Sequence, residues 1–257
     1  MEYFIICLAA LLGSGLTLFS GFGLGTLLVP VFGLFFPIET AIMLTAIVHF
    51  LNNIFKLILL GKNANLNVVF RFGIPAILFA FLGAYILSLL TEMQPLFVYK
   101  IDNATFEIMP TKLIVGLLLL FFSLFEIIPK LSHLQFNKKY LPLGGILSGF
   151  FGGLSGNQGA LRAAFLIRAN LSASSFIATG VVIACMIDIS RLSIYITDTK
   201  NFHNQLDYKL LTLATLSAFT GAYFGNKLIK KVTIKNIQNL VAILLIVFAV
   251  LLIMGII

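Results

Sequence analysis

The residues best suited to chemistry are charged or amide side chains that interrupt apolar runs. Asn157 and Gln158 lie near the end of a glycine cluster, and Arg162 follows it within the apolar run 159–167. An arginine is costly in such a run unless it meets an anion, a carboxylate or water, and its planar guanidinium suits a small oxyanion. Two roles are therefore open for Arg162: contact with an anionic ligand, or a structural ion pair with Asp188.

Two glycine clusters could bind an anion through the backbone itself. They span residues 21–25 and 152–159, and each precedes a short apolar segment. A helix that restarts after such a break turns free N–H groups and the positive end of its dipole into the protein. Glycine allows the tight turn and leaves the amides uncovered. We therefore expect a small anion to contact the backbone at Gly23, Gly25, Gly156 and Gly159.

Polar residues in two other apolar segments are expected to line the same site. Asn52 and Asn53 lie in one segment, and Asp188 lies in another, three residues before Arg191. Asp188 and Arg191 can neutralise each other on one helix face. His49 is about one turn before Asn52 and could titrate near neutral pH, so His49 and Asp188 are candidates for binding a coupling proton or ion. Alternatively, His49 is a hydrogen-bonded packing residue.

For several residues a structural role competes with a functional one. Thr45 and Thr179 could donate to a ligand oxygen, or they could bond back to the carbonyls of their own helices. Glu126 lies four residues before Lys130, which predicts an ion pair at a helix end. The glycines expected to allow close helix packing are Gly13, Gly21, Gly145, Gly149 and Gly153.

The composition places these residues in a membrane. Only 10% of the 257 residues are charged, 60% are hydrophobic, and the mean hydropathy is +1.08. A water-facing protein carries charge on about a quarter of its residues. The apolar runs do not alternate every second residue as barrel strands do, so we predict an all-α, polytopic helical bundle in the lipid bilayer. The net charge of +8 lies mostly in short loops, which indicates membrane topology and no nucleic-acid partner.

The apolar segments fall into two homologous halves. Residues 24–37 and 158–169 are short segments after the two glycine clusters, and each could cross the membrane or re-enter it. The motif Phe81-x-Gly83-Ala84-Tyr85 recurs 138 residues later as Phe219-x-Gly221-Ala222-Tyr223. We predict a first half at 1–130, a cytoplasmic linker at 131–141 and a second half at 142–257. The other expected segments are 3–20, 41–60, 68–90, 112–129, 142–154, 173–197, 208–229 and 237–257.

The loop charges predict an orientation for each half. Lys and Arg gather at 56–71, 130–139 and 227–235, which places these loops in the cytoplasm, whereas 91–111, 198–209 and both termini are expected outside. An odd number of crossings then separates 139 from 198, so the halves are predicted to be inverted about an axis in the membrane plane. Paired glycine breaks in inverted repeats are typical of transporter sites near the midplane. We expect a multi-pass protein of the inner (plasma) membrane without a removable signal peptide.

These motifs together resemble the TauE/SafE family of sulfite exporters and sulfonate permease-like proteins over residues 5–255. The resemblance rests on the glycine break before Pro30, the Phe81-x-Gly-Ala-Tyr motif and the run Gly149-Phe-Phe-Gly-Gly-Leu-Ser-Gly-Asn-Gln-Gly. It implies a two-half membrane transporter of sulfite, sulfoacetate or another organosulfonate. The second half departs from the usual pattern, because Asn157 and Gln158 occupy the break and Ala164 stands where Pro30 stands in the first half.

The leading prediction is a secondary transporter that moves a small, sulfur-containing anion by alternating access, coupled to a proton or ion gradient. An anion channel would share the same electrostatics. A divalent metal-ion permease would depend on the sparse ligand set Met43, Cys185 and Met186, and a membrane-embedded enzyme would need clustered catalytic residues. No Gly-x-x-x-x-Gly-Lys nucleotide loop is present. We expect no enzyme activity, metal site or cofactor. Both a monomer and a homo-oligomer are compatible with the sequence.

Overall fold

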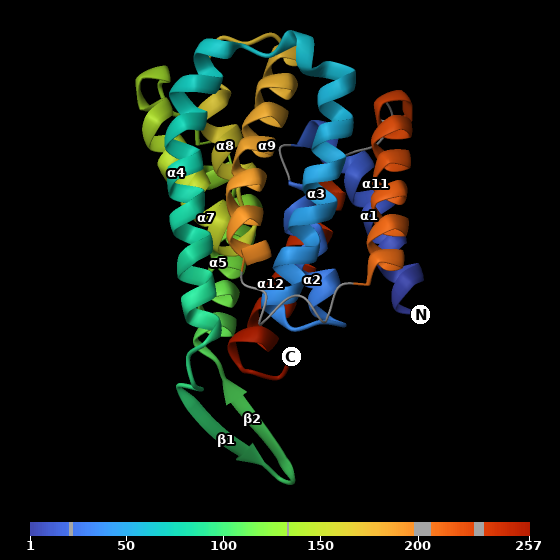
Figure 1. Ribbon diagram of the computed structural model, residues 1–257, viewed down its shortest axis with the longest axis vertical. Helices are drawn as coiled ribbons and strands as arrows, with labels where there is room; N and C mark the ends of the chain where they lie inside the picture. Colours follow the sequence, from blue (N-terminus) through green and yellow to red (C-terminus); the bar gives the residue numbers. More distant parts are fainter. Residues whose placement is uncertain (21–22, 133, 198–206, 229–233) are drawn as a thin grey trace.

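The protein is a bundle of helices with one small hairpin (Figure 1). The computed structural model describes residues 1–20, 23–132, 134–197, 207–228 and 234–257. The longer helices are α1 (Glu2–Ser20), α3 (Ile38–Leu60), α4 (Leu66–Thr91), α5 (Pro110–Ile127), α7 (Leu141–Ser155), α9 (Ala173–Thr197), α11 (Tyr208–Leu228) and α12 (Ile234–Ile253). The short helices and turns are α2 (Leu24–Gly33), α6 (Pro129–Ser132), α8 (Gly159–Leu166), η1 (Gly61–Asn63) and η2 (Lys138–Tyr140).

Several of these helices have the length and composition of membrane spans. Within the described residues, four are long and apolar enough to cross a bilayer: Ile38–Ile58, Leu66–Thr91, Pro110–Ile127 and Ala173–Thr197. Three shorter apolar helices cover Glu2–Leu16, Leu24–Gly33 and Asn239–Ile253. The predicted helical membrane bundle is therefore confirmed, and the short helices α2 and α8 follow the two glycine clusters.

The surface of α4 shows how such a helix meets lipid on one side and protein on the other. Ile74 and Leu78 are 52% and 64% exposed on one face, whereas Phe72, Ala76 and Ala80 are fully buried on the opposite face. Exposed isoleucine and leucine are unfavourable in water but match the hydrocarbon core of a bilayer. The small buried residues allow a second helix to approach closely.

That second helix is α7, and glycines make the approach possible. A Cβ built on Gly145, Gly149 or Gly153 would lie 2.1, 2.2 and 2.1 Å from the carbonyl oxygens of Phe72, Ala76 and Ala80, respectively. The obstacle is backbone, which cannot rotate away as a side chain can. The packing role predicted for these three glycines is confirmed, whereas Gly21 lies outside the described residues.

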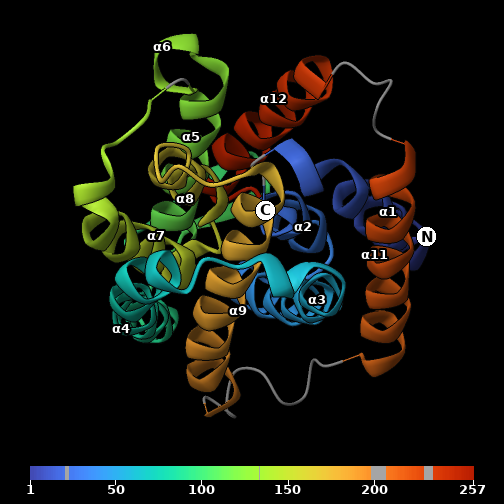
Figure 2. The same ribbon diagram turned by 90° about the horizontal axis from the view of Figure 1, so that it is seen from above.

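The helices pair across the two predicted halves. α1 packs with α11, α4 with α7, α3 with α9, and α5 with α12. Figure 2 shows α3 and α9 in the middle of the bundle, between the α1/α11 and α4/α7 pairs. In Figure 1, α3 starts at the lower end and α9 starts at the upper end. Such antiparallel pairs are what an inverted repeat would produce; the inversion and the boundary at 131–141 stay predictions.

The repeated Phe-x-Gly motif has the same packing role in both halves. A Cβ on Gly83 of α4 would lie 2.2 Å from the carbonyl oxygen of Phe150 on α7. A Cβ on Gly221 of α11 would lie 2.0 Å from the carbonyl oxygen of Leu11 on α1. Each glycine therefore allows close contact with the helix that comes from the other half.

The two ends of the bundle differ in their connections. The basic connections at η1 and η2 lie at the upper end of Figure 1, and both termini and the antiparallel hairpin of β1 (Phe97–Ile101) and β2 (Ala104–Ile108) lie at the lower end. The hairpin was not predicted from the sequence. The basic stretch 227–235 and residues 198–206 lie largely outside the described residues. Which end faces the cytoplasm stays a prediction.

Hydrogen bonds tie together the connections at the lower end. The Tyr3 hydroxyl on α1 donates to the carboxylate of Asp207, which also accepts from the backbone N–H of Leu210 at 3.0 Å. These hydrogen bonds hold the pKa of Asp207 below its usual value. The Tyr99 hydroxyl of β1 donates to the carbonyl of Met254 at 2.6 Å, which fastens the hairpin to the end of α12.

Candidate functional site

A cavity of about 460 Å³ lies where the two glycine breaks meet. Its polar and charged walls are formed by Gly23 before α2, by Gly159 and Arg162 of α8, and by His49, Asn53 and Lys56 of α3. Apolar residues of α9, including Phe176 and Ile177, form another wall. Ile167, Leu171 and Ala173 also line the cavity, so it extends toward the connection between α8 and α9, at the upper end of Figure 1.

The starts of α2 and α8 lie against one another beside this cavity. A Cβ built on Gly23 would lie 3.9 Å from the Cα of Gly159, and one built on Gly25 would lie 3.2 Å from the carbonyl oxygen of Gly156. Neither helix start has a side-chain cap, although Gly23 and Gln158 occupy the capping positions. Two sets of first-turn N–H groups therefore converge on one region, where they favour negative charge.

Gly156 explains why the second break forms at this point. Its φ of +79° lies in the left-handed region, which favours glycine, and it ends α7 by donating its N–H to the carbonyl of Gly152 at 3.0 Å. Only two residues, Asn157 and Gln158, then separate Gly156 from the start of α8. This turn places Gln158 and Arg162 beside the cavity.

Two cations, Arg162 and Lys56, line the cavity, and neither has a carboxylate partner among the described residues. Arg162 donates to the side-chain oxygen of Gln158 at 3.2 Å, and Lys56 is 5% exposed. Within the described part of the chain, neither side chain takes part in an ion pair. A buried positive charge is costly when it is uncompensated. An anion in the cavity would compensate both Arg162 and Lys56.

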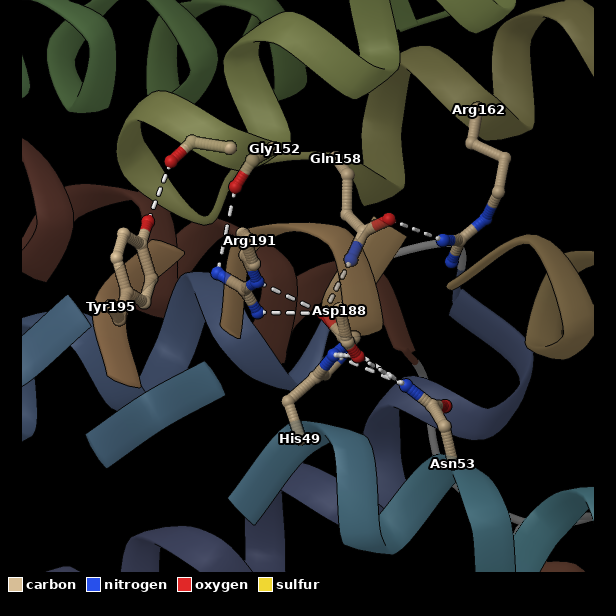
Figure 3. Close-up of polar contacts among 9 residues, drawn as sticks. His49, Asn53, Gly152, Gln158, Arg162, Asp188, Arg191 and Tyr195 are labelled. Carbon is tan, nitrogen blue, oxygen red and sulfur yellow. Dashed lines mark hydrogen bonds and ion pairs between the residues drawn. The ribbon is translucent and has the colours of Figure 1, made fainter. Parts of the chain in front are cut away.

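Asp188 is the centre of a buried polar network beside the cavity (Figure 3). One carboxylate oxygen accepts from Arg191 Nε and Nη2 at 3.0 and 2.8 Å, and from Gln158 Nε2 at 3.2 Å. The other oxygen lies 2.7 Å from His49 Nδ1. The ion pair predicted between Asp188 and Arg191 is therefore formed, while Arg162 reaches Asp188 only through Gln158. The contact with His49 joins α3 to α9, and the sequence did not predict it.

Arg191 and Tyr195 close the side of the network that faces away from the cavity. Both are almost completely buried, at 0% and 1% exposure, and neither lines the cavity. Arg191 Nη1 lies 3.5 Å from the carbonyl oxygen of Gly152, and the Tyr195 hydroxyl donates to the carbonyl of Gly153 at 2.6 Å. These contacts fasten α9 to the end of α7.

Several residues proposed from the sequence lie next to the cavity wall but do not form it. The Thr179 hydroxyl accepts from the backbone N–H of Asn65 at 2.9 Å and so holds the start of α4. Asn52 bonds with Ser14 of α1 at 3.1 Å, and Asn157 donates to Ser155 at 3.2 Å. The Thr45 hydroxyl oxygen is buried and has no hydrogen-bond partner among the residues that the structure describes. Gly25, Gly156 and Gln158 lie at the breaks, behind the cavity lining.

Lys56 lies in the polar segment with Asn52 and Asn53 that was expected to line the site, but it was not predicted as a ligand, although a signal was present. His49, Asn53 and Lys56 are spaced by four and three residues, which places them on one face of a helix. That face of α3 is the one that lines the cavity.

The geometry can be compared with known proteins. Residues 6–252 match the family described as Sulfite exporter TauE/SafE. The matched region includes both glycine breaks and every residue that lines the cavity. No curated protein matches the chain.

Proposed function

Because the chain belongs to the sulfite exporter TauE/SafE family, whose members transport sulfur-containing anions across membranes, we propose that the cavity binds the transported anion. The observation that carries this proposal is the pair of uncompensated cations, Arg162 and Lys56, beside two converging helix starts. Two positive charges match a small divalent oxyanion such as sulfite. A guanidinium and free backbone N–H groups can donate to several oxygens of such an ion at once.

We further propose that the transporter works by alternating access. Lys56 and Arg191 stand at the same position of the two predicted repeats, because both pairs Asn53/Asp188 and Lys56/Arg191 are 135 residues apart. Lys56 lines the cavity, whereas Arg191 is sealed on the opposite side. In an inverted repeat, an exchange of these two environments would open the site to the other side of the membrane.

Cysteine accessibility should distinguish the two sides of the site. With the same offset of 135 residues, Ile42 and Ile177 are equivalent positions; Ile177 lines the cavity and Ile42 is 0% exposed. In a background without Cys7 and Cys185, we expect Ile177→Cys to react with an impermeant thiol reagent only from the side of the basic loops. Ile42→Cys should become reactive only from the opposite side, and only while substrate cycles. If both cysteines react from the same side, alternating access is wrong.

A ligand screen tests the proposed anion site directly. Purified protein should be stabilised against thermal unfolding by sulfite, thiosulfate or a sulfonate, because a ligand that binds only the folded state raises its unfolding temperature. In proteoliposomes, the uptake of the same anion should saturate and exchange with anion on the other side. Ohmic conductance would instead indicate an anion channel. Stabilisation by divalent metal ions but by no anion would contradict the proposal.

The charges of the cavity favour an anion transporter over a metal-ion permease. Divalent cations are repelled by Arg162 and Lys56, and no group of three or more His, Cys, Asp or Glu side chains in the described ranges could hold a metal ion. Membrane transport is the activity of the family, and we propose no reaction that makes or breaks covalent bonds.

A further inference from the structure

We propose that His49 and Asp188 form a proton-binding site that is linked to the anion cavity, so that one proton binds together with each anion. This proposal rests on the anion site proposed above and adds the identity of the coupling ion. It follows from the position of His49, which lines the cavity and also contacts the buried carboxylate of Asp188 on α9.

The geometry identifies which atom of His49 takes up the proton. Nδ1 lies 2.7 Å from the Asp188 carboxylate, so an N–H at this position donates to it. Nε2 is then the ring acceptor. The amide nitrogen of Asn53 lies 3.1 Å from Nδ1 and 3.3 Å from Nε2, and only Nε2 can accept a hydrogen bond from it while Nδ1 carries a proton. A proton that binds to Nε2 replaces the hydrogen bond from Asn53, whose amide can turn to present its oxygen instead. The imidazole can make this change near neutral pH.

The charge balance of the network explains why this proton needs an anion. Arg191 forms two hydrogen bonds to Asp188, so the pair carries no surplus negative charge for a protonated His49. The other charged groups near His49 are Arg162 on α8 and Lys56, two turns further along the same face of α3. Both are positive and oppose a third positive charge in a buried site. An anion bound between Arg162 and Lys56 offsets them, and protonation then becomes favourable.

Gln158 provides a direct structural link between the two sites. Its side-chain oxygen accepts from Arg162 Nη1 and its side-chain nitrogen donates to Asp188, both at 3.2 Å. When Arg162 turns toward an anion, the amide of Gln158 loses one partner while it still contacts the carboxylate. We assign Gln158 as a positioning residue, because it acts on the anion through Arg162 and on the proton through Asp188.

Proton binding and anion binding affect each other in this proposal, and the effect can be measured. If the anion favours proton binding, the proton must favour anion binding by the same factor. Thiosulfate is the suitable probe because it stays a dianion across the neutral range, whereas sulfite itself takes up a proton there. For purified wild-type protein, we expect thiosulfate affinity to fall on the order of 100-fold from pH 6 to pH 8, because the uptake of one proton per anion changes the affinity tenfold per pH unit. In weakly buffered solution, a pH indicator should report the uptake of one proton for each thiosulfate bound.

Substitutions locate the proton site. His49→Gln keeps a hydrogen-bonding side chain but cannot titrate, so thiosulfate should still bind, with an affinity independent of pH and without proton uptake. Gln158→Leu should leave binding measurable and reduce its pH dependence. The other two histidines, His133 and His203, lie outside the described residues, and their glutamine variants should behave as the wild type does.

The outcomes separate this proposal from the one on which it rests. Thiosulfate binding with the same affinity at every pH would overturn the proton site and leave the anion site intact. Unchanged proton uptake in His49→Gln would also overturn it. Absence of binding by thiosulfate, sulfite and sulfonates at every pH would overturn both proposals.

Discussion

Replacing Arg162 with alanine is expected to weaken anion binding by roughly 100-fold in Kd, which corresponds to about 3 kcal/mol. The guanidinium lines the cavity, and its only hydrogen bond among the described residues is to Gln158, so its remaining N–H groups can bind an anion. Lys56 and the helix starts would remain, but a bidentate donor would be lost. Binding is measured by calorimetry or thermal shift with sulfite, and transport by uptake into proteoliposomes.

The same variant separates a ligand role from a structural role. Removing a cation that has no carboxylate partner should leave the unfolding temperature of the anion-free protein unchanged or raise it. Arg168→Ala is the matched control, because Arg168 is exposed, does not line the cavity and, among the described residues, hydrogen-bonds to Gln135 at 3.0 Å. It should keep wild-type binding. Normal anion affinity in Arg162→Ala would contradict the proposed site.

Replacing Gly149 with leucine is expected to prevent stable folding of the bundle. A Cβ at this position would lie 2.2 Å from the carbonyl oxygen of Ala76 and 2.7 Å from its Cα, so α4 and α7 would have to separate. Overpacking in a dense interior costs about 1–3 kcal/mol when side chains can adjust. Because the obstacle here is backbone, we expect a loss at or above the upper end of that range. Fluorescence-detected gel filtration and thermal unfolding in detergent measure the effect.

A control on the same helix tests whether the position of the substitution, and not its added volume, causes the loss of stability. Leu143 of α7 is 47% exposed, so Leu143→Phe adds volume toward lipid and should keep the wild-type unfolding temperature. Gly149→Ala should be destabilised less than Gly149→Leu, although its Cβ meets the same backbone atoms. A Gly149→Leu protein that elutes as a single folded species at the wild-type temperature would contradict the close contact between α4 and α7.

Much of the fold was predictable because helix formation in lipid depends on local sequence. A chain segment without water must satisfy its own backbone hydrogen bonds, so apolar length alone indicates a helix. The segments expected at 173–197 and 208–229 agree with α9 (Ala173–Thr197) and α11 (Tyr208–Leu228) almost residue by residue. The family was also recognisable from motifs along the chain.

The prediction of an ion pair between Glu126 and Lys130 was wrong, and the reason lies in the local backbone. α5 ends at Ile127, and Ile128 adopts an extended conformation before the short helix α6 begins. The spacing of four residues therefore does not bring the two side chains together. One carboxylate oxygen of Glu126 is buried without a partner in the described part of the chain. An ion pair predicted from helical spacing requires a continuous helix.

Residues close together in the chain were enough to predict the membrane environment, the helical segments, the two glycine breaks and the local pair of Asp188 with Arg191. The contacts between distant segments became known from the folded structure: His49 meets Asp188, Lys56 joins Arg162 in one cavity, and the Thr179 hydroxyl holds the start of α4 instead. These contacts depend on how each helix is rotated and tilted against its neighbours. That rotation is decided by packing between segments far apart in the chain, and no pattern within one segment encodes it.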